Sequence, residues 1–186
     1  MEKLLENQSG FVERIIRAAK LDTTLYEEVE ADTGALGQAM GVVVLASISA
    51  GVGSSTGGGL GGLVSISLIA LAAWYIWAAL IYIVGTRVFP GPRTEADLGQ
   101  LLRTIGFASA PGLVRVLGVI PGLGALVLFG AIIWELVAMV VAIRQALDYE
   151  SIGQAIRVCA VGWIIQLVII GILLSFVGSP LQPSAV

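Results

Sequence analysis

Long apolar segments dominate this chain and decide its class. A helix that crosses a bilayer needs about 20 predominantly apolar residues. Five segments meet this requirement, namely residues 35–53, 61–86, 99–119, 123–143 and 154–177. Hydrophobic residues make up 57% of the 186 residues, which is more apolar surface than a soluble domain of this size can bury. The sequence therefore predicts an all-α integral membrane protein, a bundle of five transmembrane helices.

The first 33 residues differ from the rest, because they hold eight of the thirteen acids and four of the ten bases. Within them, Phe11, Val12, Ile15, Ile16 and Ala19 recur at helical spacing, and Glu13, Arg14, Arg17 and Lys20 occupy the other face. This pattern predicts an amphipathic helix. It packs against the other helices or lies in the headgroup plane with its basic residues near lipid phosphates, and the two readings are compatible.

A second short helix is expected after it, carrying Leu25 and Val29, with Thr24 and Glu27 as a capping box. The opening MEKLLENQSG lacks the apolar core of a signal peptide, so this segment is expected to be retained. We thus expect a cytoplasmic amphipathic segment over 1–33, a membrane domain over 34–178 and a short outer tail over 179–186.

The segment 99–119 is the weakest of the five spans. It contains Arg103 and Arg115, so a re-entrant hairpin is the alternative to a crossing helix. Pro111 and Pro121 are expected to kink or end the third helix, because proline lacks a backbone donor.

Basic residues are distributed unevenly around the spans. If all five segments cross, nine of the ten Lys and Arg residues fall on the N-terminal side, and Arg115 is the exception. Because basic loops stay in the cytoplasm, we expect a multi-pass protein of the cell membrane with its N-terminus inside and its C-terminus outside. If the third segment did not cross, Arg144 and Arg157 would move to the opposite face.

Several function classes are disfavoured by what the chain lacks. It has no His and a single cysteine, Cys159, which disfavours a metal site, an internal disulfide and a Ser/His/Asp set. Residues 57–62, GGGLGG, match the spacing of a dinucleotide fingerprint but sit between two membrane segments without the acid that such a site needs, so we interpret them as a hairpin. The net charge of −3 argues against nucleic acid. We therefore expect no catalytic residues, no cofactor and no enzymatic activity.

Pairs of small residues four positions apart recur in the spans. They are Gly37 with Gly41, Ala46 with Ala50, Gly118 with Gly122 and Ala155 with Cys159. Such pairs allow helix backbones to approach closely in lipid. We favour packing within the bundle, and an interface of a homo-oligomer or with another membrane protein is the alternative.

One acidic residue, Glu135, stands inside the apolar run AIIWELVAMVVAIR. A charge at the centre of a membrane helix costs roughly 2.5–3.5 kcal/mol on insertion scales. A rise of 1.5 Å per residue puts Arg115, on the neighbouring antiparallel span, within about 5 Å of the same depth. We therefore hypothesise an Arg115–Glu135 pair that joins spans three and four. The alternative is a protonatable carboxylate in a transport path.

Residues 95–157 add a resemblance to these patterns. Gly106 and Phe107 are followed by Pro111, then by Pro121, Trp134 and the stretch ALDYESIGQAI. These features resemble the Yip (Ypt-interacting protein) domain family, and LDTTLYEEVEAD followed by GQAMGVVVLASISAGVG resembles its prokaryotic members. The resemblance implies a five-helix membrane domain with a cytosolic N-terminal region.

Eukaryotic members of that family act in vesicle traffic, bind lipid-modified Rab-type GTPases and shape membranes. This chain has a short N-terminal region and lacks their Asp-Leu-x-Gly-Pro motif; its nearest element is FPGPR. The sequence therefore does not favour a GTPase partner. The leading hypothesis is a membrane-organising or scaffold protein that recruits a protein or lipid partner. The alternative is a small oligomeric permease or channel that uses Glu135 and Arg115.

Overall fold

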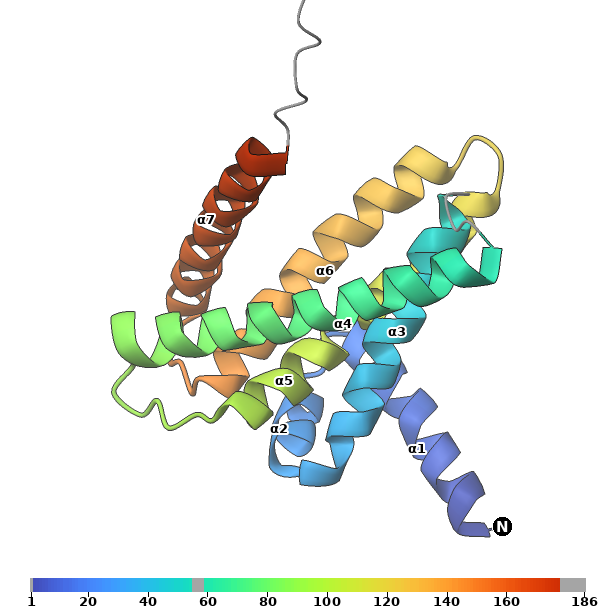
Figure 1. Ribbon diagram of the computed structural model, residues 1–186. Helices are drawn as coiled ribbons and strands as arrows, with labels where there is room; N and C mark the ends of the chain where they lie inside the picture. Colours follow the sequence, from blue (N-terminus) through green and yellow to red (C-terminus); the bar gives the residue numbers. More distant parts are fainter. Residues whose placement is uncertain (1, 55–58, 178–186) are drawn as a thin grey trace, which may run out of the picture.

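A computed structural model describes residues 2–54 and 59–177, and this part consists of helices joined by short loops (Figure 1). The elements are α1 (Glu2–Ala19), α2 (Thr23–Ala31), η1 (Thr33–Ala35), α3 (Leu36–Gly53), α4 (Gly59–Ile83), η2 (Val84–Val88), α5 (Leu98–Phe107), η3 (Ala110–Val119), α6 (Gly124–Ala146) and α7 (Ile152–Val177).

Five helical segments are long and apolar enough to cross a membrane, as the sequence predicted. They are Thr33–Gly53, Gly59–Val88, Leu98–Val119, Gly124–Ala146 and Ile152–Ile169. Residues 59–62, which we interpreted as part of a hairpin, instead form the first turn of α4. A helix satisfies backbone groups that lipid cannot, which favours extending the span into this glycine-rich stretch. Residues 57–58 and the predicted outer tail over 179–186 lie outside the described residues.

The third span is broken in the middle. Helix α5 ends at Phe107, and the tighter 3₁₀ helix η3 begins at Ala110 with Pro111 in its first turn. The same segment ends at Val119, two residues before Pro121. Both prolines thus interrupt the helix as predicted, because neither can donate a backbone hydrogen bond.

Contacts at both ends of the bundle show that the third span runs from one end to the other and that the fourth returns. Arg93 forms an ion pair with Glu150 at 2.9 Å, and the Thr94 hydroxyl donates to the Leu147 carbonyl at 2.8 Å. The loops before the third span and after the fourth therefore meet at one end. At the other end, a Cβ on Gly118 would lie 2.9 Å from the Gly53 carbonyl oxygen. This arrangement disfavours a re-entrant third segment.

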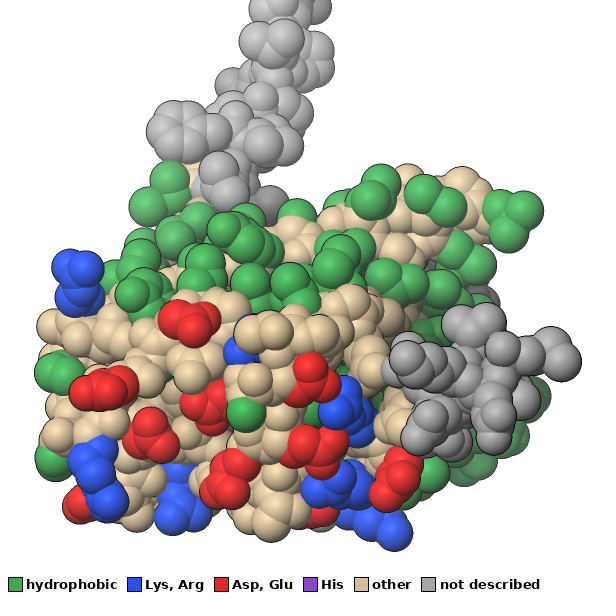
Figure 2. Space-filling view, turned by 90° about the horizontal axis from the view of Figure 1, so that it is seen from below, with side chains coloured by type: hydrophobic (Ala, Val, Ile, Leu, Met, Phe, Trp, Pro, Cys, Tyr) green, Lys and Arg blue, Asp and Glu red, His purple; other side chains and the backbone are tan. Residues whose placement is uncertain are grey.

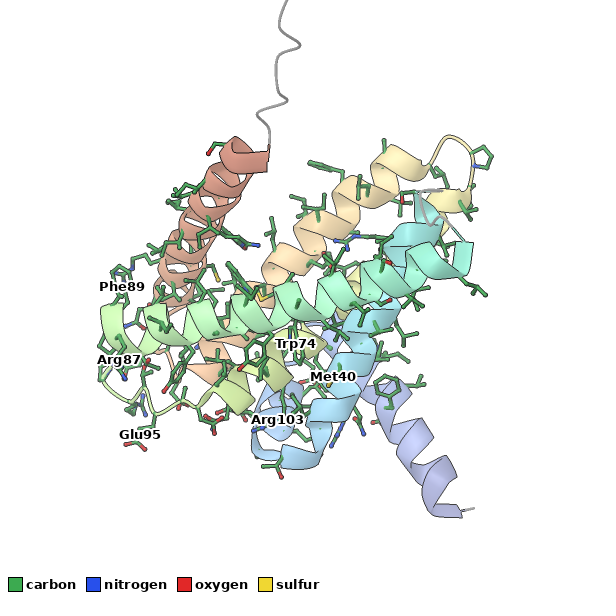
Figure 3. All side chains as sticks on the ribbon, in the orientation of Figure 1. Met40, Trp74, Arg87, Phe89, Glu95 and Arg103 are labelled. Carbon is green, nitrogen blue, oxygen red and sulfur yellow. The ribbon has the colours of Figure 1, made fainter. Side chains whose placement is uncertain are left out.

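The charged residues collect at the end where these two loops meet, together with α1 and α2 (Figure 2). Arg87, Glu95 and Arg103 lie toward this same end in Figure 3. Together, α1, α2 and the loops 89–97 and 147–151 form the polar end of the protein.

The amphipathic helix α1 packs against the bundle on one side only. Phe11 and Ile15 contact the buried cluster formed with α2, α3 and α5, whereas Val12 and Ile16 are 54% and 48% exposed. One apolar edge of this helix is therefore packed on the bundle, as the first reading predicted, and a second apolar edge stays open.

The N-cap of helix α2 lies two residues upstream of the predicted cap, Thr24. Asp22 is the N-cap, and its side chain accepts from the Thr24 backbone N–H at 3.0 Å. The proposed Thr24–Glu27 capping box is therefore wrong, since an aspartate directly upstream satisfies the free N–H group. Leu25 and Val29 are fully buried, as a helix packed on the bundle requires.

Candidate functional site

Arg115 and Glu135, the two charged residues predicted to pair, lie against each other inside the membrane domain. The Arg115 guanidinium on η3 donates to the Glu135 carboxylate on α6, and the two side chains are 20% and 21% exposed. A carboxylate and a guanidinium in this contact neutralise each other, which reduces the penalty of placing either in lipid.

Small residues make room for this pair. A Cβ on Gly112 would overlap the Glu135 carboxylate, and one on Gly53 would overlap the Arg115 backbone carbonyl. Glycine at these positions lets α3, η3 and α6 approach closely around the two charges. The broken third span therefore serves the pair, because η3 presents both Gly112 and Arg115 to the neighbouring helices.

Each member of the pair also lines a separate cavity. Arg115 borders one of about 470 Å³ near the ends of α3 and η3, with Gly53 and Gly118 in its wall. Glu135 borders another of about 190 Å³, together with Ser109 at the break in the third span and Trp163 on α7. The ion pair thus stands between two hollows in the membrane domain.

Gly112→Ala is expected to destabilise the protein by about 1–3 kcal/mol, the usual cost of overpacking a tight contact. The added methyl group would push the Glu135 carboxylate away from Arg115. Thermal unfolding in detergent measures the effect. Gly130→Ala, on α6 with nothing within 4 Å of the new Cβ, is the matched control. Equal stability of the two variants would contradict the close packing around the carboxylate.

The positions that carry the family resemblance lie in two environments. Gly106, Phe107 and Pro111 are buried, and a Cβ on Gly106 would lie 2.7 Å from that of Ala39 on α3. Trp134 is 40% exposed, and its indole N–H donates to the Ala19 carbonyl at the end of α1 at 2.8 Å. Pro121 is exposed between η3 and α6. The buried residues determine how the third span packs, and Trp134 holds the end of α1 in place.

Arg103 has a role that the sequence analysis missed. It is 6% exposed, its Nε donates to the Val29 carbonyl at 2.9 Å, and its Nη2 donates to the Glu30 carbonyl. These carbonyls belong to the last turn of α2, where a cation is favoured by the helix dipole. An arginine inside a membrane segment needs hydrogen-bond acceptors. This requirement was the one signal in the sequence that could have indicated a buried partner for Arg103.

Two arginines tie α1 to α2. Arg14 pairs with Glu28 and Asp32 at 2.9 Å each, and Arg17 pairs with Asp22 at 2.8 Å and Glu28 at 2.6 Å. The Arg17 guanidinium lowers the pKa of Asp22 to about 2 and also lowers the pKa of Glu28. Both carboxylates are therefore charged at neutral pH. Arg14 and Arg17 bind these acids instead of projecting toward lipid phosphates.

Partial burial at the end of α2 raises the pKa of Glu30 to about 7, and nearby charges modify it. Those that raise it are the acids Asp148, Glu27 and Asp97, and the one that lowers it is Arg103. Because the pKa is raised, the folded protein favours the protonated form of Glu30. The stability that this form contributes is therefore fully present below the unfolded pKa near 4.5 and is lost as pH rises through 7.

We expect Glu30→Gln to remove this part of the pH dependence. Between pH 5 and 8 the native chain should lose on the order of 1 kcal/mol of local stability at α2, after allowance for solvent screening. Amide hydrogen exchange of α2 across this range measures the loss. Glu13→Gln, on the exposed face of α1, is the control. If the stability of α2 in Glu30→Gln still fell with pH as steeply as in the native chain, Glu30 would not be the titrating group.

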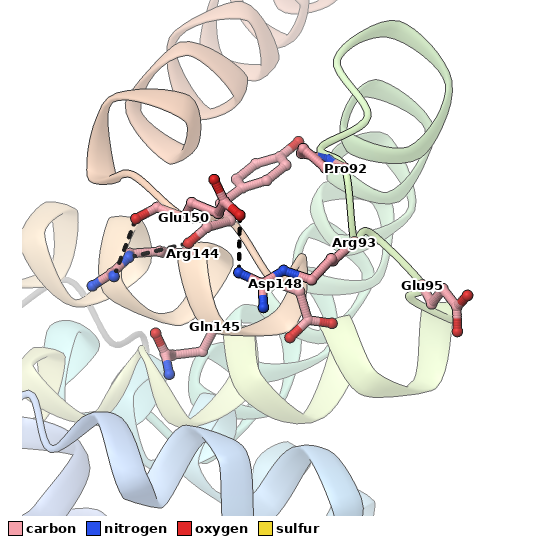
Figure 4. A pocket seen from close by; sticks show the side chains of 8 residues that line it. Pro92, Arg93, Glu95, Arg144, Gln145, Asp148 and Glu150 are labelled. Carbon is pink, nitrogen blue, oxygen red and sulfur yellow. Dashed lines mark hydrogen bonds and ion pairs between the residues drawn. The ribbon is translucent and has the colours of Figure 1, made fainter.

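A polar hollow of about 770 Å³ opens at the polar end (Figure 4). Its walls come from the loop before α5, the last turn of α6 and the loop before α7. It is lined by Pro92, Arg93, Glu95, Arg144, Gln145, Asp148, Tyr149 and Glu150. Among the described residues no group of three or more His, Cys, Asp or Glu side chains has the arrangement of a metal site.

These features define the class of the protein: an all-helical, multi-pass membrane protein of five spans with a charged end. A comparison of the sequence with models of known protein families identifies the family within this class. Residues 25–174 match the Yip1 domain, and the chain therefore belongs to the Yip1 domain family. No curated protein and no solved structure matches the chain.

Proposed function

We propose that this protein organises the membrane in which it sits, by recruiting a protein or lipid partner at its polar end. The Yip1 family membership and the five membrane segments support a non-enzymatic membrane protein. The observation that carries the proposal is that side-chain contacts at the polar end join α1, α2, α5 and α6 to one another.

Side-chain contacts hold these elements together. Arg14 and Arg17 hold α1 on α2. Arg103 joins α2 to α5, and the Gln145 amide donates to the Glu27 carboxylate at 2.9 Å, which joins α6 to α2. A surface held in one arrangement binds a partner at a lower entropic cost than a mobile one.

The orientation follows from the basic residues. Because Arg87, Arg93, Arg144 and Arg157 flank the same ends of the spans, the positive-inside rule favours a cytoplasmic polar end. In this proposal the protein lies in the cell membrane with its N-terminus in the cytoplasm and its C-terminus outside.

Release from the native membrane with a mild detergent tests recruitment. We expect a second component at a fixed ratio to the chain. The charge reversals Glu13→Lys and Glu95→Lys, on exposed residues of the polar end, should each lower that ratio severalfold. Leu126→Ala, on a residue 70% exposed along α6 away from this end, should leave it unchanged. A chain that elutes without a second component, or a ratio that ignores the reversals, would contradict the proposal.

The two cavities beside the Arg115–Glu135 pair favour one second candidate, a small permease. In this alternative the pair closes a path between the hollows and opens when Glu135 takes up a proton. Solute flux into vesicles that contain the purified chain would support it if Glu135→Gln changed the rate. Equal flux in vesicles with and without the protein would remove this candidate.

A further inference from the structure

The polar hollow lies at a defined depth in the membrane. Its lining begins at Arg144 and Gln145, in the last turn of the fourth span, and the other lining residues follow the second or fourth span directly. The apolar core of a bilayer ends where these spans end, and lipid headgroups begin there. The hollow is therefore open at the level of the headgroups.

Its walls are fixed before any ligand arrives. The Tyr149 hydroxyl lies within hydrogen-bond reach of the Phe89 carbonyl at 2.7 Å and the Gly85 carbonyl at 3.2 Å. Thr94 joins the same two loops through its bond to the Leu147 carbonyl. Binding sites depend on this kind of support, because a loose wall must be ordered again when the ligand binds.

One lining residue has an unusual backbone conformation. Asp148 follows the end of α6 with φ +49°, in the left-handed region, and the Tyr149 N–H donates to the Arg144 carbonyl at 3.0 Å. Glycine is the usual residue at this position of a helix terminus, and aspartate is tolerated there at some cost. The chain thus places a carboxylate in the hollow at a point where the backbone alone would favour glycine.

The charges in the lining are mixed. The lining holds two arginines, Arg93 and Arg144, and three acidic residues, Glu95, Asp148 and Glu150. Arg93 pairs with Glu150, and Arg144 donates to the Tyr149 and Glu150 carbonyls at 3.3 and 3.4 Å, the long end of the hydrogen-bond range. An anion alone would meet the carboxylates, and a cation alone would meet the arginines. A compact ligand with both charges satisfies both sets.

We propose that this hollow binds a phosphate ester that carries a primary ammonium group, as in the headgroup of an ethanolamine phospholipid. The arginines bind the phosphate, for which guanidinium geometry is well suited. Asp148 and Glu95 accept hydrogen bonds from the ammonium. A quaternary ammonium group donates none and is held by aromatic faces, whereas Tyr149 is the one aromatic residue that lines this hollow.

This inference names a lipid class for the lipid-recruiting form of the proposed function and rests on it. The test is native mass spectrometry of the full chain in mild detergent. It is titrated with phosphatidylethanolamine, phosphatidylglycerol or phosphatidylcholine of identical acyl chains. We expect the Kd for phosphatidylethanolamine to be about tenfold lower than for the other two, the equivalent of about 1.4 kcal/mol. Equal Kd values for the three lipids would overturn the proposal.

Variants locate the site. Arg144→Gln and Asp148→Asn should each raise the Kd for phosphatidylethanolamine about tenfold. Asparagine adopts positive φ as readily as aspartate, so Asp148→Asn removes the charge and keeps the backbone. Arg157→Gln, an exposed arginine on α7 outside the hollow, is the control. Lipid binding that is insensitive to both hollow variants would overturn the proposal.

Soluble glycerophosphoethanolamine identifies the source of the ligand. Competition as strong as that of the lipid would assign the site to a free phospho-amine, and weaker competition would assign it to the membrane lipid. No competition would overturn the headgroup's role. Because the co-purification test measures a partner ratio and not lipid affinity, failure of either proposal is distinguishable from failure of the other.

Discussion

Replacing Glu135 with glutamine is expected to lower the free energy of unfolding by about 3–5 kcal/mol, the usual cost of removing one partner of a buried ion pair. The change leaves the Arg115 guanidinium charged and without its carboxylate inside the membrane domain. The Nε atom of Arg115 is itself buried and has no hydrogen-bond partner among the described residues. Reversible unfolding in mixed micelles that contain SDS measures the loss.

Arg115→Gln should cost a similar amount, because it strands the carboxylate. The double variant should then be more stable than the sum of the two losses predicts, since no uncompensated charge remains. Leu126→Ala, on an exposed residue of α6 that lines neither cavity beside the pair, is the control for truncation outside the pair. If the double variant recovered none of the stability, Arg115 and Glu135 would not act as a structural tie.

Arg103→Met is expected to produce the second large effect, about 3–5 kcal/mol. Hydrogen bonds from a charged group contribute about 1.5–3 kcal/mol each, and this change removes two from the last turn of α2. The loss should concentrate at the polar end, because α2 is held there by α5. Limited proteolysis between α2 and α3 measures the opening of this contact.

Arg87→Met provides the comparison, since Arg87 is an exposed arginine at the same end of the spans. It should leave the cleavage rate within about twofold of the native chain, as surface substitutions usually change stability by less than 0.5 kcal/mol. Equal protection of the Arg103→Met and native chains would contradict the proposed anchoring of α2.

The membrane architecture could be predicted from the sequence because its signals are strong and local. Five apolar runs, two prolines and the distribution of basic residues gave the span count and the break in the third span. The Arg115–Glu135 contact could be predicted from the depth of each residue in the membrane. The helical rise per residue places both at similar depths on neighbouring antiparallel spans.

The polar end could not be derived in the same way. The contacts of Arg14, Arg17 and Arg103 depend on how α2 folds back under the spans, and no periodicity in 1–33 encodes that position. The hollow depends in addition on two short loops that meet across the bundle. Their contacts join residues about 57 positions apart, and a single sequence carries no signal for such pairs.

Helix termini were the other point of difference. The sequence offered Thr24 as a cap, and the structure uses Asp22 two residues upstream. Aspartate and threonine are both favoured N-caps, and Arg17 on α1 donates to the side chains of both Asp22 and Thr24. The local pattern alone therefore did not decide which of the two residues caps the helix.

In the proposed orientation, the loops 89–97 and 147–151 and helix α1 form a single cytoplasmic end. Labelling of single cysteines with a membrane-impermeant maleimide tests it directly, in a Cys159→Ala background because Cys159 is the only cysteine. In intact cells we expect Leu123→Cys, at the opposite end, to be labelled. Glu13→Cys, Glu95→Cys and Glu150→Cys should react only after permeabilisation. Labelling of Glu95→Cys and Glu150→Cys from opposite sides, or of all three from outside, would contradict the account.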